Sequence, residues 1–360
     1  MSKLALGKER KPAASMQRKI RVLVVDDSAL ARKLITKALE DSGDIEVAGT
    51  ACDGFSACTQ VAALHPDVVT LDIEMPGMNG LMFLEHCQGE RWVPAVVVSS
   101  VTNADCEIAL DALRAGAVEV IGKPIDKPGF LDFRAILPAK VRAAFTFRRR
   151  SSQPHTKPSL AIKLRTPGLI AIGSSTGGTE AVETILREMP DDAPGIVVAQ
   201  HIPAKFSTMF AERLNQVCRI EVKEARDGDK IHPGRALIAP GDQHMVVTRR
   251  LGEIEIGINQ GPRVSFQRPS IDMLFQSVAS TYGPQALGTI LTGMGCDGAA
   301  GLLEMKRSGA ATIAQDEASC AVFGMPREAI RLGAVDHVLS LDHIAITLGN
   351  FHARRLSSAT

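Results

Sequence analysis

The chain has 360 residues, of which 45% are hydrophobic and 22% charged, and its formal net charge is +1. This length predicts two domains that each bury a core, and the nearly neutral charge gives no reason to expect nucleic acid as a partner. No apolar run reaches the roughly 20 residues of a membrane-spanning helix and no signal-peptide core is present, so we expect a cytoplasmic protein.

The N-terminal part is expected to be a mobile tail followed by an α/β domain. Residues 1–18 are basic and aperiodic, whereas 19–145 alternate buried-strand runs with amphipathic segments. We expect strands at 20–25, 46–49, 68–71, 95–99 and 119–121, and helices at 29–41, 54–64, 80–87 and 106–115. Five such units predict a doubly wound parallel sheet.

Polar residues follow the carboxyl ends of these strands, namely Asp26, Asp27, Asp72, Ser99 and Lys123. Chemistry in open parallel sheets takes place at this edge. Three carboxylates would repel one another unless a hard divalent cation joined them, and oxygen ligands suit Mg²⁺. The lysine would complete a phosphoryl-transfer site. Solvated strand-end charges would explain any one of these residues, but not all five together.

The same residues lie in motifs that resemble the receiver domain of two-component response regulators: VVDDS at 24–28, LDIEMPGMNG at 71–80, VSS at 98–100 and GKP at 122–124. The resemblance implies a flavodoxin-like fold with Asp72 as phosphoacceptor. It also implies that Asp26 and Asp27 help Asp72 to hold Mg²⁺, while Ser99 and Lys123 contact the phosphoryl group. Val120 departs from the pattern, because many receivers have an aromatic switch residue there.

The rest of the chain is expected to be a linker and a second α/β domain. Residues 146–166 are basic and rich in proline and serine, which predicts an exposed linker. Residues 167–352 predict a Rossmann-like, three-layer α/β/α domain with a parallel sheet, and 353–360 a tail. Between 219 and 259, short β-rich runs with turn signals predict an antiparallel insertion.

Three strand ends in this second half carry the residue types of a nucleophile, a base and an orienting carboxylate. Ser175 lies in the turn GSSTGG at 173–178, His201 ends the next strand, and Asp297 lies in a strand-turn-helix corner at 286–300. A serine raised on such a corner, beside the free N–H groups of a helix N-terminus, suits acyl transfer. The order Ser, His, Asp differs from that of the α/β-hydrolases, so that fold is not predicted.

Several alternatives stay open on these residues alone. The Ser175 turn could be a phosphate-binding or packing turn, and His244 is a second histidine that ranks below His201. The sequence GMGCDG at 293–298 matches a dinucleotide fingerprint, although a nicotinamide enzyme would leave Ser175 and His201 without roles. A receiver joined to a non-enzymatic output module is the third alternative, but this half lacks a basic recognition helix.

The second half resembles the catalytic domain of the chemotaxis-specific protein-glutamate methylesterases, the CheB family, in which it is joined to a receiver. The matching motifs are IGSSTGGTE at 172–180, QHIP at 200–203, APGDQHM at 239–245, PSID at 269–272, LTGMGCDG at 291–298 and FGMP at 323–326. The resemblance implies that Ser175 is the nucleophile, His201 the base and Asp297 its partner. Oxyanion donors would be the backbone N–H groups of Met294 and Thr176.

The resemblance also implies substrates, partners and regulation. The enzyme would hydrolyse γ-methyl esters of glutamates on the cytoplasmic helices of chemoreceptors, releasing methanol, and would deamidate some receptor glutamines. A chemotaxis histidine kinase would phosphorylate the receiver and so relieve its block of the catalytic cleft. We expect Mg²⁺ in the receiver and no cofactor in the catalytic domain. We also expect a monomer that neither binds nucleic acid nor inserts into a membrane.

Overall fold

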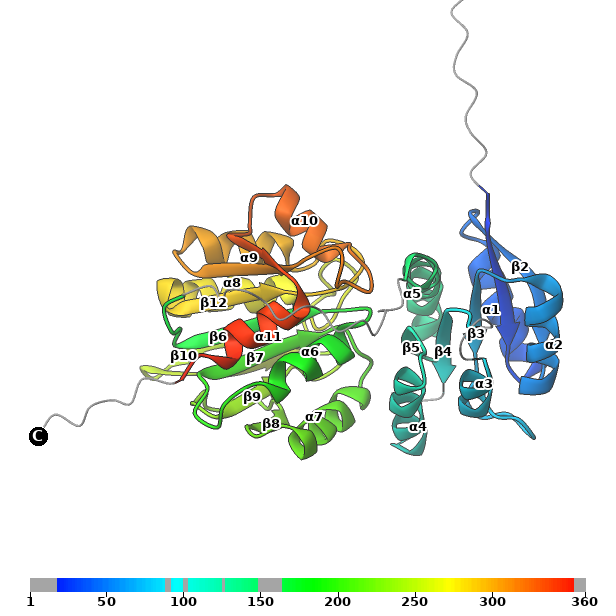
Figure 1. Ribbon diagram of the computed structural model, residues 1–360, viewed down its shortest axis with the longest axis horizontal. Coiled ribbons are helices and arrows are strands. Elements are labelled where there is room, and N and C mark those ends of the chain that lie inside the picture. The colour runs from blue at the N-terminus through cyan, green and yellow to red at the C-terminus, as the bar shows by residue number, and fades with distance from the viewer. Residues whose placement is uncertain (1–17, 88–91, 100–102, 125–126, 148–163, 353–360) are drawn as a thin grey trace, which may run out of the picture.

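The computed structural model describes residues 18–87, 92–99, 103–124, 127–147 and 164–352. Nearly all of the expected N-terminal tail, the C-terminal tail and most of the expected linker lie outside these described residues. The described chain forms two parallel sheets and one two-stranded hairpin (Figure 1). None of its described helices is both long and apolar enough to cross a bilayer.

The N-terminal sheet has the strand order β2-β1-β3-β4-β5 and all its pairings are parallel. This is the flavodoxin-like order, which confirms the predicted doubly wound fold. The elements are β1 (Ile20–Val25), α1 (Ala29–Glu40), β2 (Ile45–Ala51), α2 (Gly54–Leu64), β3 (Val68–Leu71), α3 (Gly80–His86), β4 (Ala95–Ser99), α4 (Asn103–Arg114), β5 (Glu119–Gly122) and α5 (Lys127–Thr146). We call this part, residues 18–147, the N-terminal unit.

Local sequence explains where these elements begin. β3 and β4 are apolar, mostly β-branched runs buried along their whole length, as expected of parallel strands covered by helices on both faces. α1 begins at Ser28, whose side chain accepts a hydrogen bond from the backbone N–H of Ala31. α2 begins with a capping box between Asp53 and Ser56.

The C-terminal sheet has seven parallel strands in the order β14-β13-β12-β6-β7-β9-β8. Buried apolar residues of α6, α7 and α11 pack on one face, and those of α8, α9 and α10 on the other, which confirms three layers (Figure 1). The elements are β6 (Leu169–Ser174), α6 (Gly178–Arg187), β7 (Gly195–Gln200), α7 (Phe206–Val217), β8 (Glu221–Glu224), β9 (Arg235–Ile238), β10 (His244–Arg250), β11 (Glu253–Asn259), α8 (Ile271–Tyr282), a 3₁₀ turn (Gly283–Gln285), β12 (Ala286–Ile290), α9 (Ala299–Arg307), β13 (Ala311–Gln315), α10 (Met325–Arg331), β14 (His337–Leu339) and α11 (Leu341–Gly349).

The antiparallel insertion is smaller than predicted for residues 219–259. β8 and β9 pair in parallel, and β9 pairs in parallel with β7, so both strands extend the main sheet. Only β10 and β11 form an antiparallel hairpin. Turn signals show where a chain changes direction, but not which distant strand it then joins, so the sequence pattern could not separate the two cases.

The N-terminal unit packs against the carboxyl edge of the C-terminal sheet. α4 and α5 lie on the side of the unit that faces the larger sheet (Figure 1), and α4 contacts α7. One buried apolar cluster contains residues of both parts. Among the described residues, two polar contacts cross between them: Thr176 donates to Glu119 over 2.5 Å, and Arg263 pairs with Asp132 at 3.4 Å.

Candidate active site

Ser175 lies at the corner between β6 and α6, and is 3% exposed. Its backbone N–H donates to the carbonyl of Thr292, 3.0 Å away, which ties the corner to the end of β12. Gly177 has a φ of 74°, a left-handed conformation that favours glycine. A Cβ on Gly178 would come within 2.2 Å of Gln200 Oε1, so this position also requires glycine. The two glycines therefore allow the tight corner that presents the hydroxyl.

His201 follows β7, the parallel neighbour of β6. Its backbone N–H donates to the carbonyl of Ser174 over 3.1 Å. Buried Gln200 joins the two corners, because its Oε1 accepts from Ser174 Oγ at 2.5 Å and its Nε2 donates to the carbonyl of Ser175 at 2.9 Å. Gln200 lies in the QHIP motif, but the sequence predicted no role for it, although a polar residue at the end of an apolar strand is a usable signal.

Asp297 reaches His201 from the loop after β12. Its Oδ2 lies 2.8 Å from Nε2 of His201, and both side chains are buried. The same oxygen accepts from the backbone N–H of Ile271 at 2.8 Å. Oδ1 accepts from the hydroxyl of Ser270 at 2.8 Å and the N–H of Asp272 at 3.1 Å. The structure thus brings His201 and Asp297, two of the three predicted residues, into hydrogen-bond contact. Residues at the start of α8 also bind the Asp297 carboxylate.

The charge state of Asp297 follows from these contacts. Burial by itself raises the pKa of this carboxyl group. The hydrogen bond and charge of His201, together with the backbone N–H groups of Ile271 and Asp272, outweigh burial and bring the pKa below its ordinary value. Asp297 is therefore a carboxylate at neutral pH and can stabilise a positive charge on the imidazole.

The second ring nitrogen of His201, Nδ1, is buried and has no hydrogen-bond partner among the residues that the structure describes. Ser175 and His201 line the same small cavity. The hydroxyl of Ser175 is not hydrogen bonded to the ring, as is common in enzymes without substrate. Because Nε2 faces Asp297, Nδ1 is the nitrogen left to accept a proton, the reverse of the assignment in chymotrypsin-like triads.

The predicted oxyanion donors lie in the two loops that meet at Ser175. A Cβ on Gly293 would come within 2.7 Å of the Cβ of Ser175, so the loop before Met294 lies directly against the serine. Within the part of the chain that the structure describes, the backbone N–H groups of Thr176 and Met294 have no assigned acceptor. Both groups are thus available to a ligand oxygen.

Asp272 ends the PSID motif, for which the sequence predicted no separate role, and is a second buried acid beside Asp297. Burial raises its pKa to about 6, and the negative charge of Asp297 adds to this effect. Its Oδ1 accepts from the backbone N–H of Gly301 at 2.7 Å. Asp272 occupies the first turn of α8 after Ser270, and the sequence Pro-Ser-Ile-Asp is a recognisable helix start.

The glycine pattern at 293–298 and His244 both have structural explanations. A Cβ on Gly293 would also collide with Met325, and one on Gly298 would lie 2.5 Å from Ile271. Asp297 is hydrogen bonded to His201 and to the start of α8, and its negative charge would repel a pyrophosphate. His244 is fully buried and bonded to the backbone of Pro262 and Ser270. Neither feature therefore points to a dinucleotide or to a second base.

The N-terminal unit covers the cavity that contains Ser175 and His201. The cavity has a volume of about 10 Å³, room for about one water molecule. The N-terminal unit contributes four of its lining residues: Leu113, Val118, Glu119 and Val120. Glu119 also accepts from the hydroxyl of Thr176 at 2.5 Å and pairs with Lys140 at 2.9 Å. A glutamyl side chain cannot enter while this contact persists.

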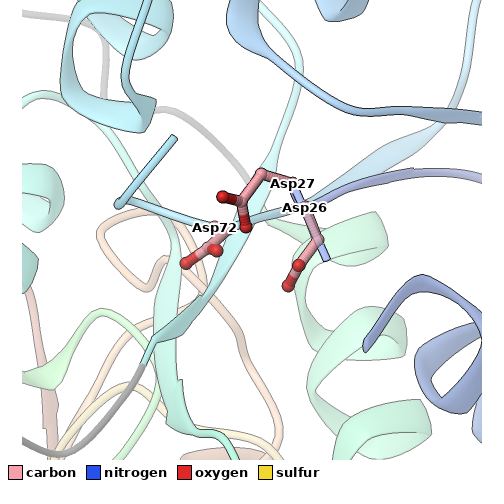
Figure 2. Close-up of side chains that lie close together, drawn as sticks. All are labelled: Asp26, Asp27 and Asp72. Atoms are coloured by element: carbon pink, nitrogen blue, oxygen red, sulfur yellow. The ribbon is translucent and has the colours of Figure 1, made fainter. Parts of the chain in front are cut away.

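A second polar cluster lies at the carboxyl edge of the N-terminal sheet. Figure 2 shows Asp26, Asp27 and Asp72 close together, and one carboxylate oxygen from each lies within 4.8 Å of the other two. Lys123 bridges two of them, with Nζ 2.9 Å from Asp26 and 2.6 Å from Asp72. Burial raises the pKa of Asp72, and Lys123 only partly offsets this effect. The bonds to the two aspartates raise the pKa of Lys123 despite its burial.

This cluster fits the metal and phosphoryl roles that the sequence predicted. Three carboxylates form a donor set suited to a hard divalent cation. Oδ2 of Asp26 is buried and, apart from its ion pair with Lys123, has no hydrogen-bond partner. The hydroxyl of Ser99 is also buried without a partner. The structure therefore places all five predicted residues at one edge, and among the described residues the hydroxyl of Ser99 has no hydrogen-bond partner.

Comparisons with known proteins match both halves. Residues 170–348 match the family described as CheB methylesterase, and residues 22–132 match the response regulator receiver domain. A protein-glutamate methylesterase/protein-glutamine glutaminase 2 of Syntrophus aciditrophicus is 51% identical over 334 residues, 91% of this chain and 97% of that protein. The corresponding enzyme of Salmonella typhimurium is 47% identical over 332 residues, 91% of this chain and 95% of its own length.

Two solved structures are also similar to parts of the chain. The CheB methylesterase catalytic domain of Thermotoga maritima is 35% identical, covers 52% of this chain and 98% of its own, and has a TM-score of 0.49. The response regulator domain of Thermotoga maritima CheB is 37% identical, covers 37% of this chain and 100% of its own, and has a TM-score of 0.34.

Proposed function

The chain belongs to the CheB methylesterase family, and from this premise we propose that Ser175, His201 and Asp297 catalyse its reaction under the control of the receiver domain. The protein is a protein-glutamate methylesterase and protein-glutamine glutaminase that carries a response-regulator receiver domain. The observation that carries the proposal is the 2.8 Å bond between His201 Nε2 and Asp297. It leaves Nδ1 unpartnered in the cavity that Ser175 lines.

The first half of the reaction forms an acyl-enzyme. Nδ1 of His201 takes the proton of Ser175 Oγ, and this oxygen attacks the γ-carbonyl carbon of a methylated glutamate. The backbone N–H groups of Thr176 and Met294 stabilise the oxyanion that develops. The C–O bond to methoxide then breaks, and the proton on His201 passes to the leaving group to give methanol. A glutamine follows the same route and loses ammonia.

The second half releases the product. Water gives a proton to Nδ1 of His201 and attacks the acyl carbon. The bond from this carbon to Ser175 Oγ then breaks, the proton on His201 returns to Oγ, and the glutamic acid formed loses its proton to solvent. Asp297 stays ionised throughout, because its low pKa favours the carboxylate. It stabilises the imidazolium in both halves and fixes the ring with Nδ1 towards Ser175.

The receiver regulates the enzyme by covering this site. Ser175 and His201 are buried, and the cavity that they share is closed by residues of β5 and α4. We propose that phosphorylation of Asp72 shifts the population towards an open state in which a receptor side chain reaches Ser175. Val120 lies in that closing surface, on the strand that leads to Lys123. A movement of Lys123 on phosphorylation can therefore shift Val120, three residues earlier in the chain, and so alter the cover of the active site even without an aromatic switch residue.

The phosphorylation site is the carboxylate cluster of the receiver. Asp26, Asp27 and Asp72 would hold Mg²⁺, which when bound would neutralise negative charge on the transferred phosphoryl group. The carboxylate of Asp72 attacks the phosphorus of a phosphohistidine on the phosphodonor, which we propose is a chemotaxis histidine kinase. The P–N bond breaks and the imidazole of the donor leaves. Ser99 and Lys123 then donate hydrogen bonds to the phosphoryl oxygens.

The partners follow from the two activities. We propose that the enzyme works in the cytoplasm on methylated helices of chemoreceptors, without inserting into the membrane or binding nucleic acid. A monomer is sufficient, because one chain supplies the serine, the histidine and the aspartate. We also propose domain limits of 19–145 and 167–352, joined by a linker at 146–166, with a catalytic domain that needs no cofactor.

Methanol release from radiolabelled receptor membranes tests the proposal. We expect Ser175→Ala to lose about 10⁴-fold or more of the turnover of wild type, in the presence and absence of acetyl phosphate and Mg²⁺. Acetyl phosphate should stimulate the wild type but not Asp72→Asn. Undiminished methanol release by Ser175→Ala would exclude this serine as the nucleophile.

A further inference from the structure

The start of α8 supplies most of the hydrogen bonds that orient Asp297. Apart from His201, the donors to this carboxylate are the hydroxyl of Ser270 and the backbone N–H groups of Ile271 and Asp272. These residues are only 25 to 27 positions before Asp297 in the chain, but β12 separates them from it. The direction of the carboxylate therefore depends on how the first turn of α8 is held.

Ser270 has a double function in this turn. Its Oγ donates to Asp297 Oδ1 over 2.8 Å and accepts from the backbone N–H of Met273, 3.4 Å away, as the N-cap of α8. Its own N–H donates to Nδ1 of His244 at 3.1 Å. The other ring nitrogen, Nε2, then carries a proton and donates to the carbonyl of Pro262 at 2.9 Å. His244 is fully buried, so both of its bonds are within the protein.

We propose that Ser270 is a positioning residue for ester hydrolysis, which holds the carboxylate of Asp297 against His201, and that His244 fixes Ser270 in place. This inference rests on the proposed roles of Ser175, His201 and Asp297. The hydroxyl binds Oδ1 and so leaves Oδ2 directed at Nε2 of the imidazole. Without it, Oδ1 keeps only the longer bond from Asp272 N–H, and the carboxylate can turn away from His201.

The position of Asp272 makes this hydroxyl more important. Its carboxyl group lies beside that of Asp297, and the negative charge of each opposes ionisation of the other. The hydroxyl of Ser270, which donates a hydrogen bond to Oδ1, stabilises the Asp297 carboxylate and offsets the repulsion from Asp272. Loss of the donor removes this stabilisation, and the carboxylate then holds Nε2 of His201 less firmly.

The test uses the full chain with acetyl phosphate and Mg²⁺, and measures methanol release per folded molecule. We expect Ser270→Ala to lower kcat about 10- to 100-fold, the effect of losing a hydrogen bond to a charged group, with little change in KM. The pH profile of kcat/KM should differ from that of wild type. Ser270→Thr, which keeps the hydroxyl, should restore most of the activity.

The matched control is Ser340→Ala. Ser340 is the N-cap of α11, where it accepts from the backbone N–H of His343 just as Ser270 accepts from Met273, but it has no contact with Asp297. It should lose a similar amount of thermal stability and keep the kcat and pH profile of wild type. Ser270→Gly is the second variant, because glycine is tolerated at an N-cap while the donor is removed. It should show the same loss of kcat as Ser270→Ala.

The outcomes separate this inference from the proposed function. If Ser175→Ala is inactive but Ser270→Ala and Ser270→Gly match Ser340→Ala in kcat and pH profile, Ser270 is only a helix cap and the inference is wrong. If Ser175→Ala stays active, the proposed nucleophile itself is wrong. A selective loss of kcat in Ser270→Ala and Ser270→Gly, reversed by threonine, supports the positioning role.

Discussion

Glu119→Ala should activate the enzyme without phosphorylation. Glu119 lies in β5 of the receiver and accepts a hydrogen bond from the hydroxyl of Thr176, the residue next to the proposed nucleophile. This bond exists only while the receiver covers the active site. Its removal therefore destabilises the closed state and leaves the open state unaffected, so the population of open enzyme rises.

The size of the effect follows from the burial of the bond. Glu119 and Thr176 are 7% and 0% exposed, and a hydrogen bond to a charged group contributes about 1.5–3 kcal/mol. This corresponds to a shift of about 10- to 150-fold in the equilibrium between closed and open states. The ion pair of Glu119 with Lys140 lies within the receiver and is lost in both states, so it largely cancels. Basal activity should rise by up to this factor, limited by the activity of fully open enzyme.

The assay is methanol release from radiolabelled receptor membranes without a phosphodonor. The matched control is Asp132→Ala, which removes the second polar contact that the described residues make between the two domains. Its partner Arg263 lies 3.4 Å away, and the two side chains are 54% and 32% exposed. Such an exposed pair contributes at most about 1 kcal/mol, so basal activity should rise less than about 5-fold.

Two further measurements test whether the Glu119→Ala variant is folded and still responds to phosphorylation. Labelling of Glu119→Ala by acetyl phosphate would show that its receiver is folded, and acetyl phosphate should then stimulate the variant less than it stimulates the wild type. If the folded variant has the basal activity of wild type, or rises no more than Asp132→Ala, the bond between Glu119 and Thr176 does not hold the enzyme closed.

Three further predictions follow from the ionisable groups. Asp72→Asn should not be labelled by acetyl phosphate with Mg²⁺, whereas labelling equal to wild type would contradict its role as phosphoacceptor. Asp297→Asn should lower kcat by about 10⁴-fold while leaving receiver labelling intact, and near-normal turnover would contradict the proposed triad. The pKa of Asp272 is about 6 in the folded protein and 3.8 as its reference value, so the ionised form destabilises the fold above pH 6, and this penalty disappears as the pH falls from 6 to 3.8. Denaturant unfolding should therefore show that Asp272→Asn is more stable than wild type at pH 8, by up to about 3 kcal/mol. This gain in the free energy of unfolding should shrink as the pH falls from 6 to 3.8. A gain that does not depend on pH would refute the raised pKa of Asp272.

The sequence was sufficient to predict the fold and to group most candidate residues. Alternating strands and helices require parallel sheets, and parallel strands end at one edge. Asp26, Asp72 and Lys123 could therefore be placed together without coordinates, and so could His201 and Asp297. Each of these inferences uses only the position of a residue relative to the end of its own strand, which is local information.

Only the tertiary structure decided how the groups are oriented and what covers them. Four contacts join segments that are distant in the chain or have no distinguishing local pattern. They are the bond of His201 Nε2 to Asp297, the bond of Ser270 to Asp297, the bond of Thr176 to Glu119 and the parallel pairing of β8 with β9. A hydrophobic period records which face of an element is buried, but the element that packs there depends on the whole fold. The polar contacts that orient the active site form only after that packing is complete.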